Sequence, residues 1–354
     1  MSLLLMVKHL RNQFLISVAC PAESMLARRL AEMKVESLHL PEPPSRFSRV
    51  GWLVHLLRTS YHIAKITCED KPILIHANNF YAAAASVLGA FLGRAKLLWH
   101  ARDLTRAGLA VRFCGVFSKR VIAVSGSVKD ELIKHGVRRD KISVVHNGIE
   151  VTESEVEAQG DAVTKMCKRE IRFANVGQFV GWKKQGLFLE AACQVDEKGG
   201  AAEYVLVGDD IFGRDLKYKT ELVRQMRSLR IAEKIKFWGW REDMGEVWRE
   251  IDCLVHTADR EPFGRVIIEA MGNMIPVIAV DSCGPGELIE NGKTGLLVGA
   301  DDAGQLSVAM LRIANDREYA RKLASAAYKK VISNFSAEKT AGHIKQIYKQ
   351  ILSA

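Results

Sequence analysis

The chain has 354 residues, of which 48% are hydrophobic and 26% are charged, an ordinary composition for a soluble globular protein. Its length exceeds what a single hydrophobic core supports, so two domains are expected. Its 7 cysteines show no Cys-x-x-Cys spacing, which argues against disulfides and structural zinc and for a reducing compartment.

The net charge of +10 is unevenly distributed. Residues 1–150 contain 22 Lys and Arg against 11 Asp and Glu, whereas residues 151–354 contain 29 against 30. The basic excess therefore belongs to the first part of the chain, for which we expect an anionic partner. Lys8, His9 and Arg11 interrupt the short leucine run at the start, so no secretory signal is predicted.

Apolar strands alternate with helices along the first part of the chain. Strands are predicted at QFLISVA (13–19), ILIHA (73–77), KLLWHA (96–101), RVIAVS (120–125) and KISVVHN (141–147), with helical spacing at 25–33 and 128–134. The segment 72–93 lacks Asp, Glu, Lys and Arg and is long enough to span a bilayer. Its polar His76, Asn78 and Asn79 instead divide it into a strand and an alanine-rich helix. Near-continuous apolar strands are typical of a parallel α/β sheet covered on both faces.

The alternation stops over residues 151–170, which we interpret as a linker, and then restarts. Strands are predicted at 171–177, 202–208, 234–240, 252–257, 276–281 and 295–299, and the tail 316–354 is predicted to be helical. The sequence thus predicts an α/β protein with two Rossmann-like, doubly wound parallel-sheet domains, 1–150 and 171–335. A central cleft is expected between the carboxyl ends of their strands. A last helix, 336–354, is expected to return toward the first domain.

Seven motifs occur in the order found in one enzyme family. They are VSGS (124–127), VVHNGIE (144–150), VGQFVGWKKQG (176–186), LVGDD (206–210), FWGWRED (237–243), EPFGRVIIEAM (261–271) and GPGELIENGKTGLLV (284–298). With them the chain resembles the retaining glycosyltransferases of family 4, which have the GT-B fold. The resemblance is strong over residues 120–300 and loose elsewhere. Several spaced motifs in the right order are far more specific than any one of them.

The resemblance implies that a sugar is moved from a nucleoside-diphosphate sugar to a glycan or lipid-linked acceptor with retention of anomeric configuration. The implied pathway is cell-surface polysaccharide or lipopolysaccharide synthesis. Residues 1–150 would bind the acceptor and residues 171–335 the nucleotide sugar. No cofactor and no metal are expected, and the lack of an Asp-x-Asp signature fits this. We expect a cytoplasmic protein that is peripheral on the inner face of the plasma membrane.

The donor's diphosphate requires fixed N–H donors and positive charge. By resemblance, Lys183, in the loop that follows Gly177, is the lysine that contacts the phosphates, although an exposed loop lysine would look the same. A helix predicted to begin near Phe263 and Gly264 offers free backbone N–H groups and a positive dipole end. Gly264 also lets the backbone approach a ligand closely. Arg265 follows at the helix start and is assigned to the donor site.

Three carboxylates are assigned to the ribose and the sugar. Glu269 matches the family's ribose-binding glutamate, the alternative being a helix charge that complements the dipole. Glu261 matches the glutamate that faces the transferred sugar. Glu287 resembles the additional acidic residue of the family's Gly-Gly-x-x-Glu loop.

The base is assigned to the turn at Gly239, Trp240 and Arg241, which matches the family's base-binding loop. Both Trp238 and Trp240 could equally be packing residues, and at least one of them is expected to be.

The first domain of the family contributes a histidine near the cleft, and His100 and Arg102 of LLWHARDLT compete for that role. Together with Lys183 and Glu261 they form the predicted catalytic group. Lys183 and the helix N-terminus would stabilise the leaving diphosphate, the role that a metal or an Arg clamp fills elsewhere.

The chain departs from the family's pattern at four places in its second domain. Gln178, still assigned to the donor site, replaces a phosphate-binding arginine. Lys184 replaces a glycine and supplies a cation that partly compensates. Residues 273–274, Asn-Met, replace a pair of a small residue and glycine, and Cys283 replaces the first glycine of the Gly-Gly turn.

The start of the chain departs further. Family members begin with a strand and a glycine-rich loop, whereas LLLMVKHLRNQ resembles the end of the helix that follows that loop. The first strand is therefore expected to be missing, with QFLISVACP as the second. A late start site, a shortened chain and a protein that dispenses with the loop all stay open. A form extended upstream is expected to be more soluble and more active.

The segment 46–66, and less clearly 104–120, has a basic helical pattern that predicts binding to an anionic membrane, the alternative being a leucine face packed on the sheet. A nicotinamide dehydrogenase is excluded because no G-x-G-x-x-G occurs between a strand and a helix. Nucleic acid is not expected as a partner because no motif has base-reading geometry. A non-catalytic or degenerate GT-B partner protein, or a GT-B relative of different activity, stays open because of Gln178 and the missing start.

Overall fold

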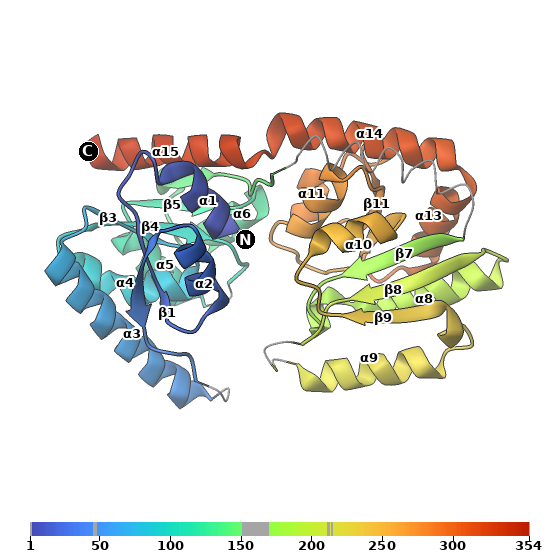
Figure 1. Cartoon of the computed structure of the whole chain (residues 1–354), viewed down its shortest axis with the longest axis horizontal. Coiled ribbons are helices and arrows are strands. Elements are labelled where there is room, and N and C mark those ends of the chain that lie inside the picture. The colour runs from blue at the N-terminus through green and yellow to red at the C-terminus, as the bar shows by residue number, and fades with distance from the viewer. Residues whose placement is uncertain are drawn as a thin grey trace. The chain divides into compact units, whose positions relative to one another are not determined.

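The structure, a computed structural model, divides into two compact units whose elements are shown in Figure 1. It describes residues 2–44, 48–105, 107–150, 170–210, 213 and 215–353. Unit 1 comprises Met1–Gly148 and Ala337–Ala354, and unit 2 comprises Ile149–Ser336. The predicted linker at 151–170 lies outside the described residues, apart from its last residue, Glu170.

Unit 1 contains two parallel sheets and the helices that cover them. Its elements are α1 (Ser2–Leu10), β1 (Ser17–Pro21), α2 (Met25–Glu32), β2 (Glu36–Leu40), α3 (Arg49–Asp70), β3 (Leu74–Ala77), α4 (Phe80–Leu92), β4 (Lys96–Ala101), α5 (Gly108–Phe117), β5 (Arg120–Ala123), α6 (Gly126–Lys134), β6 (Ile142–Val144) and α15 (Ala337–Ser353). The strand orders are β1-β2 and β3-β4-β5-β6. The segment 72–93, which lacks charged residues, is confirmed as strand β3 and helix α4. Among the described residues, none of the helices combines the length and the hydrophobicity that a membrane span requires.

The start of unit 1 differs in detail from the prediction. The first strand begins at Ser17 rather than at residue 13, because its pairing with β2 starts at Ser17 and Glu36. Strand β2, with the sequence ESLHL, was not predicted, because its side chains are half-buried or exposed and form no apolar run. As expected, a helix, α1, precedes the first strand of the described residues.

The C-terminal helix α15 packs in unit 1. In Figure 1 it runs beside α1, and the two helices share one hydrophobic cluster with β1 and β4. Within that cluster Tyr348 and Ile344 of α15 meet Val7 of α1 and Leu98 of β4. Helices α3 and α4 pack closely because Gly89 faces Ile63 and Ala64 of α3, where a Cβ atom would come within 2.9–3.2 Å.

Unit 2 is a single six-stranded parallel sheet with helices between its strands. Its elements are β7 (Ile171–Val176), α8 (Gln185–Glu197), β8 (Ala202–Val207), α9 (Leu216–Ser228), β9 (Ile235–Gly239), α10 (Met244–Glu250), β10 (Cys253–His256), α11 (Arg265–Gly272), β11 (Val277–Val280), α12 (Cys283–Leu288), β12 (Leu296–Val298), α13 (Ala303–Asn315) and α14 (Arg317–Asn334). All six predicted strands are confirmed. The strand order is β12-β11-β10-β7-β8-β9, which is the doubly wound order of a dinucleotide-type fold. The strands β10 and β11 are buried along their whole length, as their apolar sequences predicted.

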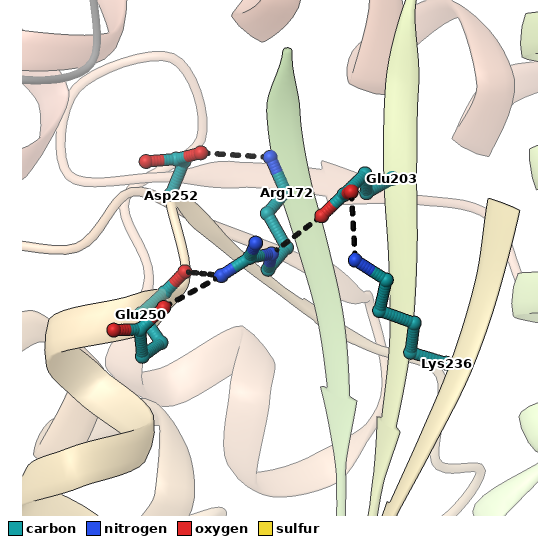
Figure 2. A network of polar contacts seen from close by, with 5 residues as sticks. All are labelled: Arg172, Glu203, Lys236, Glu250 and Asp252. Atoms are coloured by element: carbon teal, nitrogen blue, oxygen red, sulfur yellow. Dashed lines mark hydrogen bonds and ion pairs between the residues drawn. The ribbon is translucent and has the colours of Figure 1, made fainter. Parts of the chain in front are cut away.

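Polar contacts join β7, β8, β9 and the end of α10 (Figure 2). The Arg172 guanidinium donates to Glu203 and to both the backbone and the side chain of Glu250, each at 2.8 Å. Its backbone N–H donates to Asp252 at 2.7 Å, and Lys236 donates to Glu203 at 2.8 Å. With the Arg172 side chain only 14% exposed, this network ties three strands together where apolar contacts alone would not specify their register.

Candidate active site

The candidate site lies at the carboxyl ends of the unit 2 strands. Chain order runs from β7 outward through β8 to β9, and then returns to the other side of β7 with β10. Loops that leave two neighbouring strands in opposite directions open a crevice at this switch point, which is where open α/β sheets bind ligands. The loop after β7 carries Lys183 and the loop after β10 carries Glu261. The topology therefore brings together two residues that are 78 positions apart in the sequence.

The lysine loop is fixed to the end of β10 by hydrogen bonds. Lys183 ends a short 3-10 turn, Gly181–Lys183, and its carbonyl accepts from the Thr257 hydroxyl at 2.9 Å. The carbonyl of Trp182 accepts from the backbone N–H of Asp259, also at 2.9 Å. Buried Asn175 in β7 donates to the Thr257 hydroxyl oxygen and so orients it. The backbone around Lys183 is held rigidly before any ligand binds.

Lys183, Glu261 and His256 form a buried charged cluster. The Lys183 Nζ atom lies 2.5 Å from Glu261 Oε2, and His256 Nε2 lies 3.3 Å from the same oxygen. Burial opposes ionisation of Glu261, but the Lys183 ammonium and the His256 ring hold the pKa of its carboxyl at about 2. Burial also lowers the pKa of His256 below its usual value, so the ring is neutral at pH 7. The Lys183 ammonium additionally lies 4.3 Å from the centre of the Trp182 ring.

The sequence-based analysis did not select His256. It closes an apolar strand, where a histidine is easily taken for a core residue, and it is only 2% exposed. The signal that was present is its position as the last residue of β10, at the edge of the sheet where functional groups gather.

The helix that follows Glu261 begins at Arg265, close to where it was predicted. Gly264 precedes it with φ +94°, a left-handed conformation that favours glycine, and its side-chain-free backbone caps the helix. Gly284 packs against this turn so closely that a Cβ atom would lie 2.4 Å from the Phe263 carbonyl oxygen, and its N–H donates to the Glu261 carbonyl. The Phe263 ring itself is buried and contacts Phe335, so only its backbone faces the site.

Glu269 lies one turn into α11. Its carboxylate accepts from the Arg265 guanidinium at 2.7 Å, an ion pair between residues four apart on the helix. The Glu269 side chain is 19% exposed and that of Arg265 37% exposed, so the pair is accessible from solvent. Two of the three predicted carboxylates, Glu261 and Glu269, are thus paired with a cation in the structure.

The loop after β7 also carries Gly177 and Gln178. Gly208, at the end of β8, approaches Gly177 so closely that a Cβ atom would lie 1.9 Å from its carbonyl oxygen. The carbonyl of Gln178 accepts from the side chain of Gln185 at 2.9 Å, which ties the loop to the start of α8. This contact uses the backbone of Gln178.

The predicted base-binding turn follows β9. Trp240 is 49% exposed, whereas Trp238 lies against two guanidinium groups, with Arg172 and Arg241 at 5.7 and 6.0 Å from its ring centre. The structure thus makes Trp238 the packing residue of the two and leaves the Trp240 ring at the surface. Gly239 has φ +67°, and its carbonyl accepts from the Gly208 N–H.

His100 and Arg102 belong to unit 1, at the carboxyl end of β4. His100 is 1% exposed and stacks on His76, whose Nδ1 lies 2.6 Å from the Tyr348 hydroxyl of α15. Arg102 is half-buried and donates to Asn78 at 2.9 Å and to the Asn147 side chain at 2.6 Å. Of the two competing candidates, His100 is enclosed in a packed network and Arg102 is the partly exposed one.

Family models and known proteins agree on the identity of this fold. The model described as glycosyltransferase family 4 matches residues 2–153, and that of glycosyl transferases group 1 matches residues 162–330. Anabaena Alr3699/HepE, solved in complex with UDP and glucose, has a TM-score of 0.82 at 24% identity, covering 98% of this chain and 95% of that one. The chain belongs to glycosyltransferase family 4 and has the GT-B fold.

Curated glycosyltransferases match this chain over part of their length. The lipopolysaccharide core biosynthesis glycosyltransferase LpsE of Rhizobium meliloti is 27% identical over 140 residues, 40% of this chain and 40% of that protein. The UDP-Gal:alpha-D-GlcNAc-diphosphoundecaprenol alpha-1,3-galactosyltransferase of Escherichia coli is 25% identical over 243 residues, 67% of this chain and 61% of that protein. The chain thus spans less than two thirds of the length of these relatives.

The departures from the family's glycines share one backbone feature. Lys184, Met274 and Cys283 stand where the family-4 glycosyltransferase pattern has glycine, and their φ angles are +48°, +53° and +44°. The backbone at these positions keeps the left-handed conformation that glycine adopts freely, at a cost of about 1–2 kcal/mol for each larger residue. Lys184 is further held by an ion pair with Asp301 at 2.6 Å.

Glu287 lies on the short helix α12, which starts at Cys283, and its side chain is exposed. Within the described parts of the chain, no group of three His, Cys, Asp or Glu is arranged to hold a metal ion. The independence of this glycosyltransferase from metal stays a prediction, which activity in the presence of a chelator would test.

Proposed function

We propose that the protein transfers a sugar from a nucleoside-diphosphate sugar to a glycan or lipid-linked acceptor with retention of anomeric configuration, in the synthesis of cell-surface polysaccharide or lipopolysaccharide. The observation that carries the proposal is the cluster of Lys183 and Glu261 beside the N-terminus of α11, at the switch point of the unit 2 sheet. A cation and free helix N–H groups suit a diphosphate. Carboxylates on either side of them suit the hydroxyl groups of a sugar and a ribose.

The roles of the two glutamates follow from their places along α11. Glu261 precedes the helix and is almost fully buried beside Lys183, which suits contact with the sugar next to the diphosphate. Glu269 is one turn further along and more accessible, which suits the ribose. Lys183 and the helix dipole would stabilise the charge that develops on the leaving diphosphate. The acceptor hydroxyl would attack from the face that the diphosphate leaves, and its proton would pass to the diphosphate.

A panel of nucleotides tests this proposal. A ligand that binds only the native state raises the unfolding temperature, so UDP, GDP, ADP and their sugars should be compared by thermal shift. We expect one nucleotide class to stabilise the protein, and UDP is the first choice because relatives and structural neighbours are named with UDP or UDP-sugars. A shift with none of them would refute the proposal.

Substitutions separate the two carboxylates. Glu269→Ala should weaken nucleotide affinity, because the ribose hydroxyls lose their acceptor. Glu261→Ala should leave nucleotide affinity nearly intact and slow transfer, because it faces the sugar and not the nucleotide. The same defect in both variants would contradict this division of roles.

We also propose that unit 1 binds the inner face of the plasma membrane, where a lipid-linked acceptor would be found. Helix α4 contacts both α3 and α5, and all three expose apolar side chains, with exposed fractions between 43% and 87%. These side chains are Val50, Leu53, Val54, Leu57 and Tyr61 of α3, Leu88, Phe91 and Leu92 of α4, and Leu109, Phe113, Val116 and Phe117 of α5. Residues 49–123 carry eleven Lys and Arg against three Asp and Glu, so an anionic surface is the matching partner.

Flotation with vesicles tests the membrane proposal. The protein should float with phosphatidylcholine vesicles that contain phosphatidylglycerol and less with phosphatidylcholine alone. Leu57→Glu and Phe113→Glu should reduce flotation, whereas Val308→Glu, at an equally exposed apolar side chain of unit 2, should not. Flotation that depends neither on the anionic lipid nor on these substitutions would refute the proposal.

A further inference from the structure

The cation assigned to the donor's diphosphate is paired with a carboxylate in the structure. Lys183 Nζ lies 2.5 Å from Glu261 Oε2, and the side chains are 15% and 11% exposed. A diphosphate that approaches Lys183 therefore competes with a carboxylate that is already in contact with it. Binding of the donor must draw the ammonium away from Glu261 or share it.

Release of Lys183 leaves a costly group behind. An ionised carboxylate in a buried position is strongly unfavourable unless it is hydrogen-bonded or paired. Glu261 is 9% exposed, and among the described residues His256 is the second side chain that pairs with its Oε2 atom, at 3.3 Å. Whether His256 donates a hydrogen bond to this oxygen therefore determines how easily Lys183 can move away from Glu261.

We propose that His256 is a positioning residue that holds the Glu261 carboxylate when Lys183 moves to the donor's diphosphate. A neutral imidazole has one N–H to donate, and the Nε2 atom of His256 is the nitrogen that faces the carboxylate. While Lys183 is in place, this buried nitrogen makes no hydrogen bond of normal geometry with the described residues, so it is available to the carboxylate. The inference rests on the proposed function, since it assigns a partner to Glu261 in the donor-bound state.

The backbone is built for this exchange. Thr257 fixes the carbonyl of Lys183, so the main chain stays in place while the long, flexible side chain is free to turn. His256 immediately precedes Thr257 at the end of β10, and the Gly284 N–H anchors the carbonyl of Glu261. The histidine and the carboxylate are thus held on rigid backbone, and Lys183 is the mobile partner.

Affinity for UDP, measured by isothermal titration calorimetry, tests the inference without an acceptor. In His256→Leu the carboxylate loses its remaining donor, so UDP should bind about tenfold more weakly, the effect expected when a hydrogen bond to a buried charged group is lost. His256→Gln keeps a side-chain N–H and should bind UDP within about twofold of the wild type. In Glu261→Gln, Lys183 has no competing carboxylate, so UDP should bind at least as tightly as to the wild type.

The double variant distinguishes this role from a merely structural one. His256→Leu combined with Glu261→Gln should bind UDP like Glu261→Gln alone, because no carboxylate remains to be held. Unchanged affinity in His256→Leu, or a tenfold loss that persists in the double variant, would overturn the inference. Equal losses in His256→Leu and His256→Gln would also overturn it. Failure of the wild type to bind UDP, GDP or ADP would instead overturn the proposed function, and with it the premise of the exchange.

Discussion

Replacement of Lys183 by methionine should destabilise unit 2 well beyond the loss of an exposed charge. Methionine keeps most of the length of the side chain and removes the ammonium, which leaves the Glu261 carboxylate buried beside a neutral histidine. Breaking a buried pair from one side costs about 3–5 kcal/mol, because the remaining charge has lost its opposite charge, which a neutral N–H donor replaces only in part.

The magnitude can be worked out independently from Glu261. The fall of its pKa from 4.5 to about 2 corresponds to about 3 kcal/mol of stabilisation of the carboxylate in the folded protein. Since the pKa is lowered on folding, this contribution is present above pH 4.5 and is lost as the pH falls toward 2. Because His256 contributes to this shift as well as Lys183, we expect Lys183→Met to lower the free energy of unfolding by up to about 3 kcal/mol at pH 7.

A double-mutant cycle measures the pair itself. Urea unfolding can be followed by tryptophan fluorescence, since four of the 6 tryptophans (182, 238, 240 and 248) lie in unit 2. Lys183→Met with Glu261→Gln should recover most of the stability lost in Lys183→Met, because the unpaired charge is gone. Lys184→Met is the matched control: its partners Asp301 and Asp259 are 69% and 40% exposed, so the loss should stay below about 1 kcal/mol. A Lys183→Met effect no larger than the control, or no recovery in the double variant, would refute the reasoning.

Three further predictions concern stability. Burial and the nearby Arg102 charge lower the pKa of His76 to about 3, so between pH 6.5 and pH 3 the unfolded chain binds a proton at His76 that the folded protein does not bind. The free energy of unfolding should therefore fall as the pH drops through this range. His76→Gln should reduce this pH dependence in urea unfolding experiments, and an unchanged pH dependence would contradict the prediction. Arg172→Met should lower the free energy of unfolding by about 3 kcal/mol in the same assay, because its side chain is only 14% exposed. Lys236→Met should lower it by less than about 1 kcal/mol, because that side chain is 46% exposed. Equal losses in the two variants would argue against the network of Figure 2. Cys283→Gly should be more stable than Cys283→Ala by about 1 kcal/mol in thermal unfolding, because glycine adopts φ +44° without the steric cost that a Cβ atom brings. Equal stabilities of the two variants would show that the backbone at this position is not strained.

The sequence predicted the unit 2 sheet well because its strands are buried on both faces. A strand such as β11, with the sequence Val-Ile-Ala-Val, is buried and apolar at every position, so a continuous apolar run marks it without knowledge of its neighbours. The same argument fails for β2, whose half-exposed residues ESLHL satisfy one pairing partner, β1, and little else. Strand β2 forms because it pairs with the edge of β1, and this pairing leaves no apolar pattern in the sequence of β2 itself.

The backbone strain at the departures from the family was also beyond the sequence. Lys184, Met274 and Cys283 were recognised as replacements for glycine, and their chemistry suggested a compensating cation or a change in packing. The structure shows that each keeps a positive φ angle. That conformation is imposed by the turns around these residues, since a lysine, methionine or cysteine by itself favours negative φ.

What the sequence provided by itself was the prediction of the groups at the candidate site: Lys183, Glu261 and Glu269 stand in motifs that can be recognised from the local sequence. What only the tertiary structure decided was their pairing. Lys183 meets Glu261, rather than standing free for a phosphate, because β7 and β10 are neighbours in the sheet although β8 and β9 separate them in the chain. His256 joins them for the same reason, because a buried histidine acquires a role from the charge beside it, and that charge is brought there by folding.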